Sequence, residues 1–222
     1  MHNHHKHDNS LEDVITVIDF ARDDMLGYVG YLWRYLSYTL NVSSAISFWN
    51  SGDVARCAKI SLCTLYYLGF CLASARLFGA AFCLAYVIYP MAQGVVIMAA
   101  INYTWHAFVH PGDEQNRLIN STTIVNGDYF ILMEEYHAVH HLYAGVHWTK
   151  HAAMYERHKD DCKVPTRFYG LSVFELWAMI VLRNYAGLAA NSGIDEQVLV
   201  ARLRHTVQRE LAPPTAVVPR PA

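Results

Sequence analysis

Two long stretches without a charged side chain constrain this sequence more than any other feature. Residues 60–75 contain no Asp, Glu, Lys or Arg, and residues 77–105 form a second such run. A helix needs about 20 apolar residues to cross a hydrocarbon core of about 30 Å. The second run exceeds that length, and the first reaches it if the apolar stems of Lys59 and Arg76 extend it. We therefore predict a transmembrane hairpin over about 57–103, with spans of about 57–75 and 80–103 and a turn near 76–79.

The alternative is a pair of buried core helices in a soluble α-helical protein. The placement of positive charge favours the membrane, because Lys and Arg concentrate in cytoplasmic segments. Of the 17 Lys and Arg residues, only Arg76 lies in the predicted turn. The N-terminal part and everything after His106 should therefore share the cytoplasmic face. A net charge of −2 leaves no basic surface for a nucleic-acid backbone, so nucleic acid is not an expected partner.

The segments around the hairpin complete the expected architecture. Residues 11–49 are expected to be helical, with Asn9 or Ser10 as the cap, and the aromatic residues 25–49 to lie along the membrane interface. A third span over 25–49 remains an alternative. The fold class is thus an all-α integral membrane protein with a transmembrane hairpin, interfacial helices and a cytoplasmic, histidine-rich helical cap. One domain covers 1–210, and the proline-containing tail 211–222 is expected to be disordered.

A histidine pattern at 137–141 carries the chemistry. His137, His140 and His141 have helical spacing i, i+3 and i+4, so one face of a helix presents three imidazoles, a typical arrangement for binding a metal. A solvated polar turn after Glu134 and Glu135 is the alternative. Six other histidines precede this box in two groups, at the N-terminus and after the second charge-free run: His2, His4, His5, His7, His106 and His110.

Two further patterns accompany this box. Asn102 and His106 have the spacing NxxxH at the end of the second charge-free run and share a helix face; His106 is either a ligand or a hydrogen-bonded packing residue. His4 and His5 stand as the last two positions of another HxxHH box, whose first position is occupied by Met1. An affinity tag would also explain histidines at the N-terminus, but a tag is usually a uniform run.

These residues resemble the membrane fatty acid desaturase and hydroxylase family. The resemblance covers residues 1 to about 159. It is carried by NYTWH at 102–106, HAF at 106–108, NS at 120–121, YHAVHH at 136–141 and HW at 147–148. The family's HxxxH box, and the two spans that would carry it, are missing here. This departure suggests the C-terminal portion of a longer protein, cut within its second histidine box; a short variant that uses His2 and His7 instead is the alternative.

The resemblance implies two non-haem irons that activate O2 for attack on an unactivated methylene. It implies six histidine ligands and Asn102 acting through a water: His4, His5, His106, His137, His140 and His141. Six are few for two irons. Further candidates at the site are His2, His7, His110 and His147, with Asp8, Glu134 and Glu135 orienting ring N–H groups. His151, His158 and His205 are expected to be solvated.

The resemblance also implies the substrate and partners. A lipid acyl chain or acyl thioester would be desaturated, with hydroxylation or acetylenic-bond formation as variants. Electrons would come from an external donor of the ferredoxin or cytochrome b5 type, because no Gly-rich dinucleotide motif is present. Two other hypotheses remain open at this point. One is a membrane zinc hydrolase with three or four histidine ligands, and the other is an inactive fragment that holds no complete metal centre.

Overall fold

The computed structural model describes residues 4–114, 120–160 and 166–208. The predicted disordered tail, His2 and Met1 lie outside these residues. The elements, in chain order, are α1 (His4–His7), α2 (Met25–Thr39), α3 (Val42–Asn50), α4 (Val54–Phe78), α5 (Ala80–Cys83), a π-helical segment (Leu84–Ile88), α6 (Tyr89–Trp105), β1 (Thr123–Val125), α7 (His137–Leu142), a 3₁₀ turn (Trp148–Lys150), α8 (His151–His158), β2 (Arg167–Tyr169), α9 (Val173–Val181), α10 (Tyr185–Ser192) and α11 (Glu196–Arg204).

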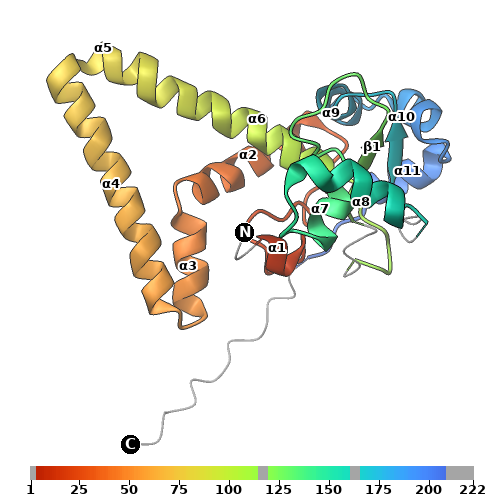
Figure 1. The fold of residues 1–222 in the computed structure, drawn as a ribbon, viewed down its shortest axis with the longest axis horizontal. Helices are drawn as coiled ribbons and strands as arrows, with labels where there is room; N and C mark the ends of the chain where they lie inside the picture. Colours follow the sequence, from red (N-terminus) through yellow and green to blue (C-terminus); the bar gives the residue numbers. More distant parts are fainter. Residues whose placement is uncertain (1–3, 115–119, 161–165, 209–222) are drawn as a thin grey trace, which may run out of the picture.

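The predicted hairpin is present, with slightly longer arms than expected. Helix α4 spans Val54–Phe78, and α5, the π segment and α6 form a continuous arm over Ala80–Trp105. Both are long and apolar enough to cross a membrane. The chain reverses at Gly79, whose φ of 92° lies in a region that an L side chain rarely adopts. Figure 1 shows the two arms meeting at a sharp corner far from the rest of the molecule.

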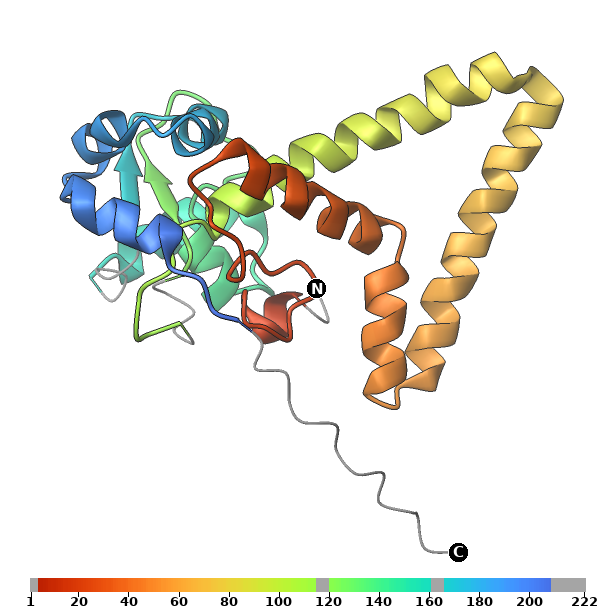
Figure 2. The ribbon, with the colours of Figure 1, turned by 180° about the vertical axis from the view of Figure 1, so that it is seen from behind.

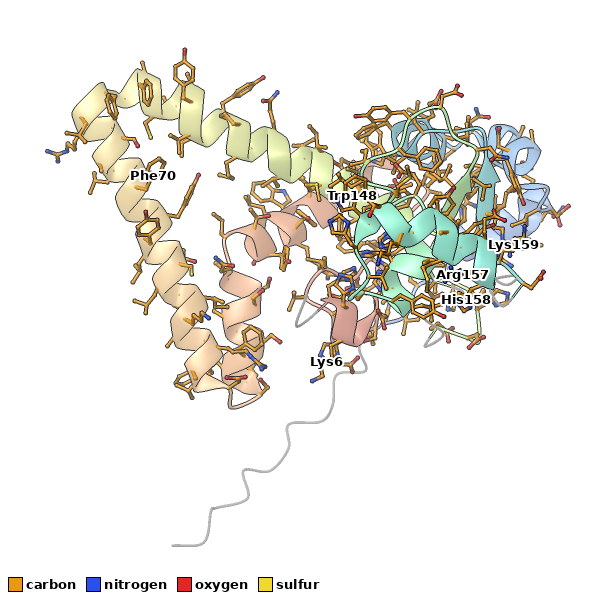
Figure 3. All side chains as sticks on the ribbon, in the orientation of Figure 1. Lys6, Phe70, Trp148, Arg157, His158 and Lys159 are labelled. Carbon is orange, nitrogen blue, oxygen red and sulfur yellow. The ribbon has the colours of Figure 1, made fainter. Side chains whose placement is uncertain are left out.

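Most side chains on the hairpin face away from other protein. Leu62, Leu65, Phe70 and Leu72 on α4 are all at least half exposed. Figure 3 shows the side chains of α4, Phe70 among them, projecting into open space around the helix. A helix that is apolar all round and unburied is suited to lipid rather than to water. This exposure argues against the alternative of two buried core helices.

The π-helical segment lies just before a proline in the second arm of the hairpin. Pro90 stands near the start of α6 and has no backbone N–H to continue the helical ladder. A local widening of the helix to i→i+5 spacing at Leu84–Ile88 keeps the arm continuous past this residue. The arm therefore reaches the folded part of the protein, where its last residues, including Asn102 and Trp105, are buried.

The expected helix over residues 11–49 is wrong in its first part. Residues 8–24 form irregular turns, and α2 begins only at Met25, with Asp24 as its cap. Side chains compete for the backbone here: Asn9 Oδ1 accepts from Val17 N at 2.8 Å, and Asp13 Oδ1 accepts from Ile15 N at 3.0 Å. The remainder is split into α2 and α3 at Asn41, which adopts φ of 60°. Neither is a candidate span among the described residues, and their position at a membrane interface stays a prediction.

The all-α expectation needs one correction. Strands β1 and β2 pair in parallel, with Ile124 opposite Phe168, between the hairpin and the C-terminal helices. Both of these side chains are fully buried, together with Leu176 of α9 and Leu199 of α11. A second cluster packs α2 against α6 through tyrosines such as Tyr31 and Tyr103. In Figure 2 the base of α6 lies between α2 and the body that carries α7 to α11.

Candidate metal centre

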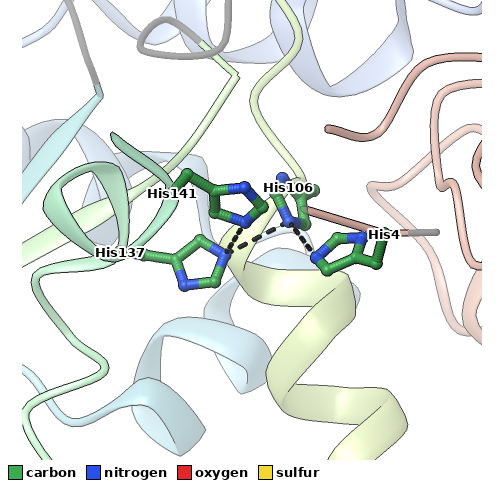
Figure 4. Close-up of side chains that lie close together, drawn as sticks. All are labelled: His4, His106, His137 and His141. Atoms are coloured by element: carbon green, nitrogen blue, oxygen red, sulfur yellow. Dashed lines mark hydrogen bonds between the residues drawn. The ribbon is translucent and has the colours of Figure 1, made fainter. Parts of the chain in front are cut away.

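Four imidazoles from three distant parts of the chain converge at the base of α6. They are His4 of α1, His106 directly after α6, and His137 and His141 of α7. All four are buried, and one ring nitrogen of each lies within 4.8 Å of the others. Figure 4 shows the rings pointing toward a common centre. The spacing i, i+4 on α7 places two of them on one helix face, as predicted.

The atoms that converge are the Nε2 nitrogens. His106 Nε2 lies 3.3 Å from His4 Nε2 and 3.2 Å from His137 Nε2. His137 Nε2 lies 3.0 Å from His141 Nε2. Imidazole nitrogens bound to one metal ion at about 2.0–2.1 Å are separated by little more than these distances.

In three of the rings the other nitrogen, Nδ1, lies next to an oxygen atom that can accept a hydrogen bond. His4 Nδ1 lies 2.5 Å from Asp13 Oδ2, and His141 Nδ1 lies 2.6 Å from Asp8 Oδ1. His106 Nδ1 lies 2.9 Å from the carbonyl oxygen of Asn120. A neutral imidazole carries one N–H, and these acceptors favour its location on Nδ1. The Nε2 lone pairs are then left facing one another, an arrangement that a cation stabilises.

Burial also keeps three of the rings, those of His106, His137 and His141, neutral. It lowers the pKa of His106 to about 3, and the neighbouring His4 contributes to the same shift. Burial, and then the other imidazoles, lower the pKa values of His137 and His141 well below the usual 6.5. His137 Nδ1 is buried with no hydrogen-bond partner among the described residues. Neutral imidazoles with converging lone pairs fit a transition-metal ion, because a metal ligand must be deprotonated.

A second group of side chains lies beside the first. His5 Nε2 is 3.3 Å from His140 Nε2, and His140 Nδ1 is 3.2 Å from Glu134 Oε2. Burial and the neighbouring Glu135 raise the pKa of Glu134 to about 7. One donor atom each of Glu134, His140 and His151 lies within 4.8 Å of the others. The six predicted histidines thus divide into a cluster of four and a pair.

The expectation that His151 is solvated is wrong. The residue is buried, with an exposed fraction of 1%. It is the first residue of α8, and its ring centroid lies 5.5 Å from that of His140. No HxxHH or NxxxH spacing includes this residue. Only the folding of α8 against α7 brings it near the site, so local sequence offered no signal.

The remaining candidates are not members of the four-histidine cluster, although Asn102 lines the same cavity as His4 and His137. Asn102 Nδ2 donates to Tyr31 Oη at 2.6 Å, which leaves a role through water as a prediction. His110 is half-buried beside Pro111, and His147 is exposed and contacts Thr149. His7, half-buried, lines a separate polar cavity. Glu135 is buried and accepts from the backbone N–H of Ile131 instead of orienting a histidine.

An apolar cavity of about 380 Å³ adjoins both groups. His5, Glu134 and His140 line it from the polar side. Its apolar wall comes from α2, from α6 and from the segment before α7: Tyr35, Tyr38, Met98, Ile101, Trp105 and Leu132. Trp105 also stacks on His137, with ring centroids 5.2 Å apart. A cavity of this composition is suited to an apolar ligand.

Comparison with known protein families identifies the family of this chain. Residues 1–170 match the sequence model of the family described as fatty acid desaturase. The chain belongs to the fatty acid desaturase family. Searches of curated proteins and of solved structures found no match. In this desaturase family member, the matched residues include every side chain of both groups, and they end before α9. Helices α9 to α11 add the apolar core that supports the base of α6.

Proposed function

We propose that this protein is a membrane-bound, di-iron, O2-dependent oxidoreductase that acts on the acyl chain of a lipid or acyl thioester. Desaturation is the favoured reaction, and hydroxylation or acetylenic-bond formation would use the same site. The observation that carries the proposal is the convergence of the His4, His106, His137 and His141 Nε2 atoms in a chain of this family. Bound iron would supply the activation of O2 needed to remove hydrogen from a methylene group.

The chain's own residues would hold the metal and position the substrate. His4, His106, His137 and His141 form one candidate ligand set, and the facing pair His5 and His140 lies beside it. The carboxylates of Asp8 and Asp13 fix two of the rings through Nδ1.

The apolar cavity supports an acyl chain as substrate. Its wall of tyrosine, methionine, isoleucine and tryptophan side chains would exclude water and bring a methylene near His140. We place α4 and the α5–α6 arm across the bilayer and the histidines at its cytoplasmic face, where the chain could enter from the lipid. An external donor, of the ferredoxin or cytochrome b5 type, would deliver electrons there.

Metal analysis of the untagged protein tests the proposal. Purified in detergent, it should contain iron, and His137→Ala should lose the iron of the four-histidine cluster because two of the short Nε2 distances involve this ring. Zinc in place of iron would favour a zinc hydrolase, and absence of metal would favour an inactive fragment. Four imidazoles on one zinc would leave no position for a catalytic water, which makes the hydrolase the weaker hypothesis.

Product analysis tests the reaction itself. Protein supplied with a reduced donor, O2 and acyl lipids should convert the lipids to products whose acyl chains are two hydrogens lighter, as measured by mass spectrometry. Products heavier by one oxygen atom would indicate that the reaction is hydroxylation and not desaturation. His110→Ala is a suitable control, since His110 contacts Pro111 outside both groups.

A further inference from the structure

Two histidines and one carboxylate form a compact group on the outer side of the four-histidine cluster. Glu134 precedes α7, His140 belongs to α7, and His151 begins α8. One donor atom of each lies within 4.8 Å of the others. We propose that Glu134, His140 and His151 form a second metal-binding site, of the two-histidine, one-carboxylate type, for a divalent transition-metal ion such as Fe(II). This inference deepens the proposed function and rests on it for the identity of the metal.

The distances are close to those of a bound ion. Glu134 Oε2 lies 3.2 Å from His140 Nδ1, which is near the separation of two ligands on one metal. The His140 and His151 ring centroids are 5.5 Å apart. Shifts well below the length of a side chain would bring all three donors to coordination distance. Glu134 and His140 have room for such shifts, because their side chains remain 28% and 16% exposed.

The two ring nitrogens of His151 cannot both make a favourable hydrogen bond in this position. Its Nδ1 lies 3.3 Å from the Met133 carbonyl oxygen, and its Nε2 lies 3.3 Å from the Val146 carbonyl oxygen. A neutral imidazole has one N–H and can donate to only one of these oxygens. The other nitrogen then directs a lone pair toward an acceptor inside the protein, which is unfavourable. A metal ion on that nitrogen would remove the conflict.

The donor set indicates what kind of ion would bind. Two histidines and one carboxylate on one side of an ion, with the other positions open, are typical of non-haem Fe(II) sites that react with O2. Glu134 and His140 line the apolar cavity, so open positions on this ion would face the space proposed for the acyl chain. Binding at His140 Nδ1 leaves His140 Nε2 directed at His5. The carboxylate would also reduce the positive charge of the ion, which the neutral imidazoles of the first cluster cannot do.

Iron content measured on the full chain tests the site. Protein loaded anaerobically with Fe(II) and desalted should retain two ions per chain by elemental analysis. His151→Ala and Glu134→Gln should each retain one ion, because each removes one of three donors. His137→Ala should lose the ion of the four-histidine cluster. His158→Ala is the matched control and should retain two, since His158 lies on α8 but its ring contacts Tyr143 instead.

The outcomes separate this inference from the proposed function. A wild-type chain that holds one ion, lost in His137→Ala and kept in His151→Ala, would refute both the second site and the two-iron content of the proposed function, and would leave only the four-histidine site. Two ions retained in both His151→Ala and Glu134→Gln would also refute it, because these side chains would then be packing residues. No ion in any protein would refute both proposals. Far-ultraviolet circular dichroism compared with His158→Ala shows whether each variant is folded, and Glu134→Gln preserves size where His151→Ala does not.

Discussion

His141 Nδ1 lies 2.6 Å from Asp8 Oδ1, so a turn near the N-terminus fixes the orientation of a ring on α7. Asp8 has φ of 40° and directly follows α1, which carries His4. Asp13, five residues later, holds His4 in the same manner. The N-terminal part before α2 is therefore part of the candidate metal centre, since α1 supplies His4 and the irregular segment after it supplies the acceptors for two rings.

Asp8→Asn should weaken metal binding without unfolding the protein. Asn tolerates the positive φ of this position but removes the carboxylate charge that makes His141 a better ligand. We expect affinity for the ion of the four-histidine cluster to fall about tenfold, near the lower end of the range for such partners. Competition with a chelator measures the change. Asp195→Asn, at the cap of α11, is the control, and an equal loss there would contradict the prediction.

Arg22→Met should destabilise the whole fold. The Arg22 side chain is fully buried and donates to carbonyl oxygens of Ala107 at 2.6 Å, Arg202 at 2.7 Å and His205 at 2.5 Å. Burial lowers its pKa only to about 10, so it stays charged at neutral pH. Removing the guanidinium leaves several buried carbonyls without a donor, at about 1–3 kcal/mol each.

The expected loss for Arg22→Met is thus about 3 kcal/mol or more, measured by chemical unfolding in detergent. The same change at exposed Arg157 should cost less than about 0.5 kcal/mol. Equal effects at the two positions would show that Arg22 does not join the N-terminal segment to the C-terminal helix.

Gly27→Ala should disrupt the start of α2. A Cβ at Gly27 would lie 2.1 Å from the Ala21 carbonyl oxygen, which is backbone and cannot move aside cheaply. We expect a loss of about 1–3 kcal/mol and a lower thermal midpoint. Gly69→Ala on α4 is the control, because nothing lies within 4 Å of its Cβ. That change should be neutral or stabilising by up to about 1 kcal/mol. A stable Gly27→Ala protein would contradict the contact.

Acid should destabilise the metal-free protein. The unfolded chain protonates its histidines near pH 6.5, whereas burial holds the pKa of His106 at about 3 in the folded state. Between these values the unfolded state binds more protons, so stability falls as pH falls from 6.5. Fully buried His106 alone contributes up to about 1 kcal/mol per pH unit in this window. Thermal midpoints at pH 7.5, 6.5 and 5.5 measure the slope. His106→Gln should reduce it, and an unchanged slope would contradict the assignment.

The hairpin and the helical histidine box could be read from the sequence. The charge-free runs at 60–75 and 77–105 depend only on composition over a helix length, and α4 and the α5–α6 arm match them closely. The spacing of His137 and His141 likewise depends only on the period of a helix. The helix expected from residue 11 failed because side chains of Asn9 and Asp13 take backbone hydrogen bonds that a helix would use.

Only the tertiary structure decided which histidines meet. His4 and His137 are joined through His106 at the base of α6, although these three residues belong to segments far apart in the chain. His151 enters the second group because α8 packs against α7, and Asn102 turns to Tyr31 because α2 packs against α6. Local sequence sets the period of a helix and its apolar length. Long-range packing sets the partner of each polar side chain, because a buried donor or acceptor must find its partner wherever the fold brings one.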